Sequence, residues 1–580
     1  MVTKCYFIVI LLALQAVDAC GYSELKRLGK ADRPKPGLFR VRGVHNRLLP
    51  TAPVSTHPYR MIFQYDTLNQ YTTTNPSMAT YGEMSKRIYG RMGNYLNTYF
   101  QVTYYDTIST GPFTCGGYSY SGYTVNADYL VLVLPQYDPN VSYFAAASGC
   151  IDDLATGRPV IGSYYLNFAY MYTNARSEHI YFHVVLHEAT HLLGFSSYYY
   201  TKYRKPNNGG TYSQSEAMTT SNISGQTFSF LKYPNLLNFA KSYYNDNTII
   251  GVPLEDEGGA GSAGSHWEKT FFPTEYMNPT TENYPVISDF TIELLRATGW
   301  YTIATNGAQV YNWGRGQGNA FFTFCPTTSG YCPTNMIGKF YCSDTYKTKA
   351  SCFKWSEFTN NCPLKVETTS VCEIQIDKDP IPKMDVETYG PQSRCIEYQQ
   401  KSSGDITPAC QNVACNQNNQ ITITQADGTL FTCSSAGQVI NYNSDFQIMC
   451  PDPVDFCIKL GQKCPDDCYV NGKGICMRNN ECFCFHGKAT NGTCSPDNGY
   501  LEIPSSDNVN QTGNTGSGAG GSSGGINGQS GTGPSGLAGA INITNNSNNS
   551  NTSNETNTSK YAAISSAVWT LVALLLLIMF

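Results

Sequence analysis

The sequence has little net charge, and its charged residues form no clusters. The 580 residues include 38 lysines and arginines against 43 acidic side chains, a formal charge of −5. Proteins that bind a phosphate backbone gather basic residues on one face, so the absence of such a stripe excludes nucleic acid as an expected partner. Apolar residues are plentiful, and at 41% of the chain they supply material for more than one hydrophobic core.

Cysteine is absent between Cys20 and Cys115, but twenty cysteines follow from Cys115 onward. An even set of this size is typical of disulfide bonding in an oxidising compartment, although the pairing cannot be read from the sequence. The amino end predicts the same compartment, because Lys4 precedes a short apolar run that ends in small residues, as in a secretory signal peptide. Glycosylation sequons, which are used in the secretory pathway, occur at Asn140, Asn222, Asn491 and Asn510 and in a cluster from 542 to 557.

Histidine is also scarce, yet half of the eight histidines recur at four-residue steps, at His179, His183, His187 and His191. Residues four apart share a helix face, so two such imidazoles can bind one tetrahedral Zn²⁺. Side chains four residues apart on a helix differ by about 40° in direction around its axis, so one ion can be bound only by two histidines that are neighbours in this series. We expect His187 and His191 to be the ligands, because only this pair encloses a glutamate in the pattern H-E-x-x-H and is followed by a glycine. His183 is then expected to be a packed histidine near the site, and His179 to lie at the surface.

Glu188 and Gly194 complete this motif. A carboxylate one residue after the first ligand can reach a metal-bound water without joining the coordination sphere, and zinc lowers the pKa of that water to about 7. Glu188 is therefore the candidate general base, and the alternative is an ordinary solvated helix carboxylate. Gly194 predicts that the helix ends just after His191, which lets the chain turn back toward the metal.

A catalytic zinc needs a third protein ligand and keeps one position open. No histidine follows His191 within a few residues, and the next two are His266, in Gly-Ser-His-Trp-Glu-Lys, and His486, among later cysteines. By elimination we expect His266 to be the third ligand. Met277 is suitably placed for the methionine-containing turn that underlies the zinc in metzincins, with plain core packing as the alternative.

These motifs together resemble the leishmanolysins, the metzincin peptidases in which a long insertion separates the helix from the third histidine. The segments 157–162, 288–301 and 393–395 add to the resemblance, which covers roughly residues 60 to 450. It implies one catalytic Zn²⁺ held by the three histidines. Leishmanolysins typically carry a prosegment cysteine that caps the zinc. Because cysteine is missing between Cys20 and Cys115, a cysteine switch is expected here only if Cys20 itself serves.

Periodicity predicts an α+β fold for the catalytic part. Apolar runs at 128–134 and 162–170 predict strands, and 177–195 predicts an amphipathic helix that carries the ligands. Alternating residues at 420–424 predict a further strand in a disulfide-stapled, mostly β domain. The resemblance to metzincins implies that the second predicted strand borders the cleft and pairs with an extended substrate.

Composition divides the chain into seven expected segments. Six closely spaced cysteines from Cys464 to Cys494 resemble an EGF-like module. A Gly, Ser, Asn and Thr-rich stretch follows, which predicts a disordered stalk. The last residues are apolar to the end with no basic flank, which is typical of a GPI-anchor signal; the alternatives are a short transmembrane segment or a secreted form. The segments are a signal peptide (1–19), an amino-terminal segment or short prosegment (20–55), a metzincin-type protease domain (56–302) with a long insertion (196–263), a cysteine-rich domain (303–458), an EGF-like module (459–496), a glycosylated stalk (497–559) and the GPI signal (560–580).

The expected function is that of a zinc endopeptidase, held at the extracellular face of the plasma membrane by a lipid anchor and acting on proteins or peptides. The alternative is an adhesion or receptor protein that uses the protease scaffold for binding. Glu188 between two ligands favours the enzyme, because a binding scaffold has no physical need for a general base beside the metal. The sequence does not predict the oligomeric state.

Overall fold

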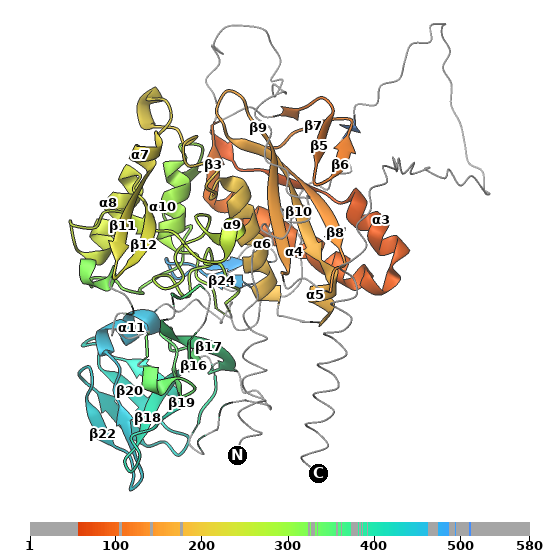
Figure 1. Cartoon of the computed structure of the whole chain (residues 1–580). Helices are drawn as coiled ribbons and strands as arrows, with labels where there is room; N and C mark the ends of the chain where they lie inside the picture. Colours follow the sequence, from red (N-terminus) through yellow and green to blue (C-terminus); the bar gives the residue numbers. More distant parts are fainter. Residues whose placement is uncertain are drawn as a thin grey trace, which may run out of the picture. The chain divides into compact units, whose positions relative to one another are not determined.

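The computed structural model describes residues 56–461, apart from short internal gaps between 104 and 391, and then 474–485, Cys494 and Asn510–Gln511 (Figure 1). The predicted signal peptide, prosegment and GPI signal lie outside the described residues, as do Cys20 and His486. Within the described part, no helix is both long enough and apolar enough to cross a bilayer.

A four-stranded mixed sheet organises the amino-terminal half. Its order is β2-β8-β10-β9, in which β8 runs parallel to β2 and β10, and β9 runs antiparallel to β10. The strands are β2 (Met61–Gln64), β8 (Tyr129–Gln136), β9 (Ala145–Asp152) and β10 (Pro159–Asn167). The apolar run predicted at 128–134 is β8, and it is buried on both faces, as a continuous hydrophobic strand requires.

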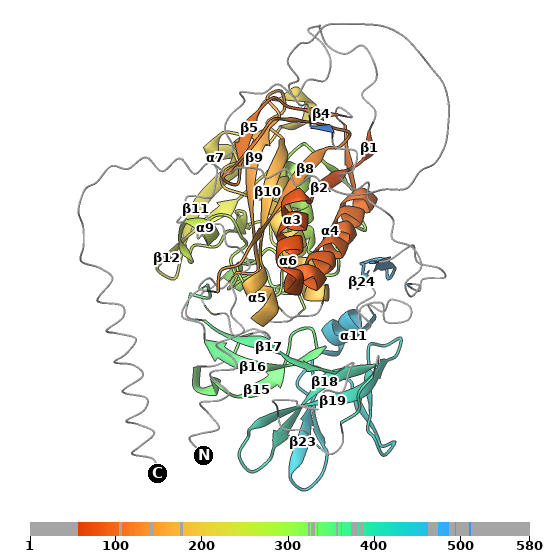
Figure 2. The same cartoon turned by 90° about the vertical axis from the view of Figure 1, so that its right-hand side faces the viewer.

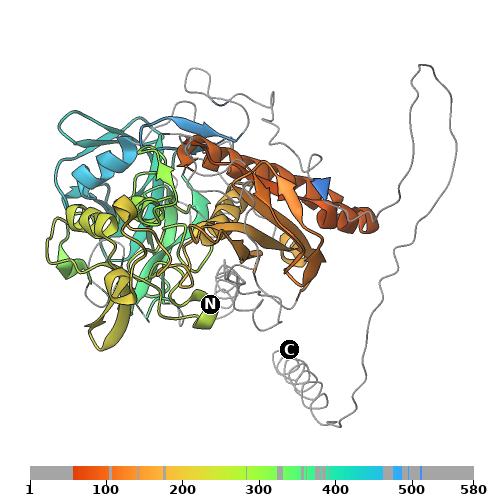
Figure 3. The same cartoon turned by 90° about the horizontal axis from the view of Figure 1, so that it is seen from above.

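Side chains of β8 alternate between two cores, because successive residues of a strand point to opposite faces. Val131 and Val133 join the larger core beneath the helices, whereas Leu130 and Leu132 join a smaller core with Ile108 and its neighbours. Figures 2 and 3 show the red helices α3 and α4 lying along one face of the orange strands. The small strands over the other face are β4 (Ile108–Ser109), β5 (Phe113–Cys115), β6 (Tyr118–Tyr120) and β7 (Tyr123–Val125).

The helix predicted at 177–195 is α6 (Glu178–Leu193), which confirms that the four histidines at four-residue steps lie on one helix. It packs against α4 and β9 within the larger core. The strand predicted at 162–170 ends earlier than expected, because the chain turns helical at Phe168. The helices are α3 (Asp66–Thr74), α4 (Ala79–Tyr99), α5 (Phe168–Thr173), α7 (Gln214–Ala217), α8 (Pro234–Tyr244), α9 (Gly259–Ser262), α10 (Asp289–Ala297) and α11 (Pro453–Gly461).

The long insertion expected between the helix and the third histidine has its own secondary structure. It contains α7, α8 and α9 and a three-stranded sheet of β11 (Met218–Ile223), β12 (Gln226–Leu231) and β13 (Val252–Pro253). Helix α8 packs against α10, which follows the third histidine in the sequence. A second three-stranded sheet joins β1 (His57–Pro58), β3 (Phe100–Val102) and β14 (Thr302–Ile303).

The cysteine-rich region is mostly β and disulfide-bonded, as predicted. A three-stranded sheet has β15 (Phe340–Cys342), β16 (Thr348–Lys354) and β17 (Pro363–Val371). A six-stranded sheet has β18 (Ser393–Gln400), β19 (Ile406–Cys415), β20 (Ile421–Thr424), β21 (Leu430–Cys433), β22 (Val439–Asn441) and β23 (Phe446–Met449). Disulfides in this region join Cys325–Cys362, Cys332–Cys352, Cys342–Cys395, Cys372–Cys410, Cys415–Cys457 and Cys433–Cys450.

The hairpin β24 (Gly474–Cys476) and β25 (Cys482–Cys484) packs on the catalytic half. The Phe483 ring lies 5.6 Å from that of Tyr95 in α4, and the Phe485 ring lies 4.8 Å from that of Phe182 in α6. This part of the expected EGF-like module therefore belongs to the core around the ligand helix. The EGF-like identity itself stays a prediction. Within the expected disordered stalk, Asn510–Gln511 (β26) instead pairs with β7.

Candidate metal centre

The three predicted ligands meet at one point. The Nε2 atoms of His187 and His191 lie 3.1 Å apart, and His266 Nε2 lies 3.1 Å from the first and 3.2 Å from the second. A tetrahedral zinc with bonds of about 2.0–2.1 Å places its nitrogen ligands about 3.3 Å apart, so the spacing fits one zinc ion. Two of the imidazoles come from successive turns of α6, and the third comes from the loop after the insertion, as elimination predicted.

Backbone carbonyls orient all three rings. His187 Nδ1 lies 2.7 Å from Tyr276 O, His191 Nδ1 lies 2.7 Å from Phe195 O, and His266 Nδ1 lies 3.0 Å from Ser262 O. A carbonyl oxygen can only accept a hydrogen bond, so each Nδ1 carries the ring proton. In a neutral imidazole each Nε2 is then unprotonated and exposes its lone pair. Three lone pairs that converge within hydrogen-bond distance without a proton repel one another unless a cation lies between them. The donor set therefore fits a bound metal ion.

Burial keeps these imidazoles neutral. It lowers the pKa of His191 to about 4 and that of His266 to about 3, the latter also because His191 is close. Burial and the two neighbouring histidines lower the pKa of His187 well below its usual value. Neutral imidazole is the form that binds zinc, so the surroundings favour the ligand form at neutral pH.

Gly194 makes the turn that the sequence predicted. Its φ of 125° lies in the region that favours glycine, and a Cβ there would lie 2.9 Å from the Trp300 ring. The turn brings the Phe195 carbonyl back over the last helical turn, where it accepts from His191 Nδ1. Tyr203 OH donates to Gly194 O over 2.8 Å and holds this peptide in place. Gly194 thus orients the second ligand as well as ending the helix.

Met277 lies fully buried in a turn beside the first ligand. The preceding Tyr276 gives its carbonyl to His187, and its hydroxyl lies 2.9 Å from Thr190 Oγ1 in the same helix. Met277 O accepts from the backbone N–H of Trp267 over 3.1 Å, which ties the turn to the loop of the third ligand. The turn therefore contacts both segments that supply imidazoles, as expected of structural support.

Glu275 fixes the turn that contains Met277 by hydrogen bonds. Its carboxylate accepts from Ser288 Oγ over 2.8 Å and Thr291 Oγ1 over 2.6 Å, and from the backbone N–H of Met277. Burial raises the pKa of Glu275 to about 7, against the lowering effect of those hydrogen bonds. The turn is thus fixed to the start of α10 by a buried acid.

Glu188 is completely buried, with an exposed fraction of 0%. The alternative of a solvated helix carboxylate is therefore wrong. Tyr164 lies close enough to be affected: burial raises the pKa of Tyr164 well above its usual value, and its electrostatic interactions with Tyr89 and Glu188 raise that pKa further. His183 is buried, as expected, and lies outside the three-histidine cluster. His179 lies within α6, but its side chain is outside the described part of the structure.

The strand order corrects one expectation about the substrate. The second predicted strand, β10, is paired with β8 on one side and β9 on the other, so it has no free edge for a peptide. Among the described strands, β2 and β9 are the two edges of this sheet, and β9 is the edge next to β10. The disulfide Cys115–Cys150 holds it to β5, and α6 packs against it.

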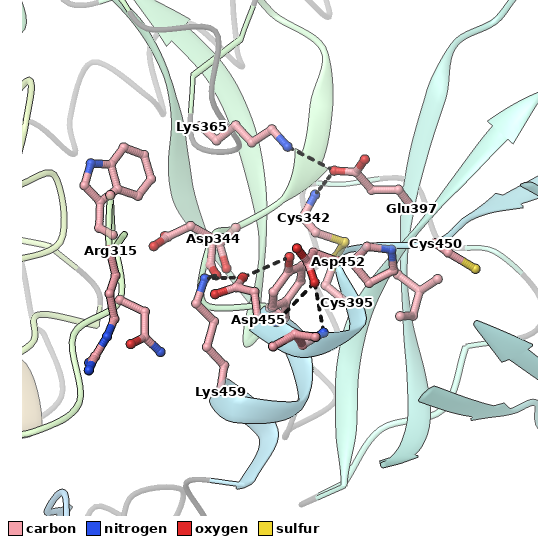
Figure 4. A pocket seen from close by; sticks show the side chains of 18 of the residues that line it. Arg315, Cys342, Asp344, Lys365, Cys395, Glu397, Cys450, Asp452, Asp455 and Lys459 are labelled. Atoms are coloured by element: carbon pink, nitrogen blue, oxygen red, sulfur yellow. Dashed lines mark hydrogen bonds and ion pairs between the residues drawn. A yellow bond between two sulfur atoms is a disulfide. The ribbon is translucent and has the colours of Figure 1, made fainter. Parts of the chain in front are cut away.

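A separate cavity of about 780 Å³ is lined by residues from the segments 312–321, 342–346, 395–397 and 449–459 and by Lys365 (Figure 4). None of the three histidines lines it. Its charged groups largely satisfy one another, since Lys459 pairs with Asp455 at 2.8 Å and Lys365 pairs with Glu397 at 3.3 Å. This cavity is therefore not part of the metal centre.

Sequence reasoning missed the groups that orient the ligands. The carbonyls of Ser262, Phe195 and Tyr276 leave no side-chain signal, because any residue supplies a carbonyl. Gly194 was the one available indication that the chain turns back at His191.

A helix bearing H-E-x-x-H, whose two imidazoles meet a third from a distant loop, defines a centre of the zinc-peptidase type. Comparison with known proteins agrees. The sequence model of the leishmanolysin peptidases (Peptidase_M8, Leishmanolysin) matches residues 102–384, which include all three histidines and Glu188. The chain is leishmanolysin-like, and leishmanolysins are a family of zinc metallopeptidases.

Curated relatives point to the same family. The chain is 28% identical to the leishmanolysin-like peptidase of Drosophila melanogaster over 206 residues, 30% of each chain. It is 24% identical to leishmanolysin of Leishmania major over 380 residues, 57% of this chain and 60% of the relative. It is 26% identical to the human ciliated left-right organizer metallopeptidase over 273 residues, 44% of this chain and 33% of that protein. The chain thus spans between about a third and three fifths of the length of these relatives.

Proposed function

We propose that the protein is a zinc endopeptidase that hydrolyses peptide bonds in proteins. The observation that carries this proposal is the convergence of three unprotonated Nε2 atoms, each ring fixed by a carbonyl at Nδ1. His187, His191 and His266 would hold the ion. Zinc, when bound, supplies Lewis acidity to the scissile carbonyl and to the attacking water.

Glu188 takes the proton of the attacking water and passes it to the leaving amine in this proposal. Its position next to His187 in the sequence and its complete burial support the role, because a carboxylate shielded from solvent is a stronger base toward a nearby proton donor.

We propose that an extended substrate binds by pairing with the edge strand β9. An open strand edge offers N–H and C=O groups that pair with a peptide, and such pairing would orient the scissile bond. Helix α6, which carries two of the three histidines, packs against β9, so a peptide paired with this edge would lie near the metal centre.

Cleavage of an unstructured protein such as casein tests the proposal, with zinc content measured alongside. Activity in the parent that is lost in Glu188→Ala, while zinc stays bound, supports a Glu188-assisted peptidase. If the parent and Glu188→Ala both hold zinc and neither cleaves casein, residues 20–55 are removed. This variant distinguishes a latent enzyme, kept inactive by its amino-terminal segment, from the adhesion alternative. Activity gained on removal indicates latency, and continued inactivity contradicts the peptidase.

The proposed location is the extracellular face of the plasma membrane, through a GPI anchor. The apolar carboxyl end without a basic flank supports it. Release of the protein from intact cells by a phosphatidylinositol-specific phospholipase is the expected result. Retention after that treatment contradicts the anchor.

A further inference from the structure

A second group of potential metal ligands lies beside the third histidine. Glu255, Asp256 and Glu268 each offer a carboxylate oxygen, and these oxygens all lie within 4.8 Å of one another. Glu255 is 2% exposed and Glu268 is completely buried, so this is no solvated surface patch. Two buried carboxyl groups beside a half-buried third repel one another strongly unless something neutralises them.

One oxygen of the group has no protein partner. Glu268 Oε1 accepts from the backbone N–H of Thr270 over 3.0 Å and from Asn360 Nδ2 over 3.1 Å. Glu268 Oε2 is equally buried, yet it receives no hydrogen bond from any residue that the structure describes. A buried carboxylate oxygen without a donor costs several kcal/mol, so this oxygen needs either a proton or a bound cation.

The lysine next to Glu268 in the sequence has other partners. Lys269 follows Glu268, but its Nζ forms an ion pair with Glu282 and a hydrogen bond with Thr280. Only its backbone N–H reaches the cluster, donating to Glu255 Oε2 over 3.2 Å. Within the described part of the chain, no lysine or arginine side chain forms an ion pair with the three carboxylates.

We propose that Glu255, Asp256 and Glu268 bind a structural Ca²⁺ ion, distinct from the three-histidine centre. Calcium takes six to eight oxygen ligands at about 2.3–2.6 Å, so oxygens up to about 5 Å apart can share one ion. Carboxylate oxygens without nitrogen or sulfur suit a hard cation rather than zinc. The second oxygens of the carboxylates and water molecules would fill the remaining coordination positions of the ion.

The site joins segments that are distant in sequence. Glu255 lies in the last part of the insertion, and its backbone N–H donates to His266 O over 3.0 Å. Glu268 lies two residues after that histidine. Asn360 comes from the loop closed by the disulfide Cys325–Cys362, and its side chain also donates to Asp256 Oδ1 over 3.3 Å. Bound calcium would tie the loop of the third histidine to both the insertion and the cysteine-rich region.

Calorimetric titration of CaCl₂ into the zinc-loaded protein tests this site, with Glu268→Gln, Asp256→Asn and a control, Asp405→Asn. Asp405 carries the same charge but is exposed, in an ion pair with Lys339. We expect the parent to bind one Ca²⁺ with a Kd between about 10⁻⁵ and 10⁻³ M, and the unfolding temperature to rise with calcium. Binding should vanish in Glu268→Gln, weaken at least about tenfold in Asp256→Asn and stay unchanged in the control.

Two results overturn the proposal. One is the absence of saturable calcium binding in the parent up to about 10 mM, as would follow if a shared proton neutralises the cluster. The other is equal affinity in the parent and Asp256→Asn. If Glu268→Gln loses zinc and fails to fold, the half-buried Asp256 decides the question alone. Zinc content, measured in every sample, separates this site from the histidine centre.

Discussion

His187 Nδ1 donates to the carbonyl of Tyr276 over 2.7 Å, so the first predicted ligand is oriented by the turn that also contains Met277. The same turn receives the backbone N–H of Trp267, the neighbour of the third ligand. One turn therefore sets the direction of the first imidazole and the position of the loop that carries the third. The geometry of the three-histidine cluster therefore depends on this backbone as well as on the histidines.

Gly194→Ala should destabilise the protein and weaken zinc binding. The new Cβ would lie 2.9 Å from the Trp300 ring at a φ of 125°, and relief would move the Phe195 carbonyl away from His191. We expect a loss of about 1–3 kcal/mol in the free energy of unfolding. Gly210→Ala is the matched control, because its φ is +80° but nothing lies within 4 Å of the added Cβ. Equal losses in the two variants would contradict the role of Trp300 packing.

Glu275→Gln should change how stability depends on pH. Burial raises the pKa of Glu275 to about 7, against 4.5 for an ordinary glutamate. Between these values the native state holds a proton that the unfolded chain has lost, so this residue's contribution to stability falls as pH rises through that window. The fall is at most about 1 kcal/mol per pH unit, and glutamine abolishes it.

Urea unfolding of zinc-loaded parent and Glu275→Gln at about pH 5 and about pH 8 measures this effect. The parent should lose more stability than the variant on going to the higher pH. A stability difference between the two proteins that is the same at both pH values would show that Glu275 does not titrate in this window.

Phe485→Ala should destabilise the catalytic half, although the residue lies far along the chain. Phe485 is 3% exposed, and its ring packs on Phe182 of the ligand helix at 4.8 Å. Truncation of a buried phenylalanine costs about 3–5 kcal/mol, measured here as a lower unfolding temperature of the zinc-loaded protein. Leu430→Ala, at a position that is 62% exposed, should have little effect. A normal unfolding temperature in Phe485→Ala would mean that the hairpin is an independent module.

The sequence predicted the parts of the site that follow from local patterns. His187, Glu188 and His191 form a helical motif, and the scarcity of histidine left His266 as the third ligand. It could not predict that β10 lies inside the sheet, with β2 and β9 at the edges, because strand order depends on long-range packing that periodicity does not record. The hairpin at 474–485 was likewise assigned to a separate module, since cysteine spacing does not reveal that Phe485 packs on α6.

Zinc content, measured for the purified parent and for His266→Ala, shows whether the three histidines hold the ion. We expect one zinc per chain in the parent, held by three imidazoles, and a loss of most of that zinc in a variant that keeps the secondary structure of the parent. His183→Ala, at a buried histidine of the same helix that lies outside the cluster, should keep its zinc. A full equivalent of zinc in His266→Ala would contradict the three-histidine centre.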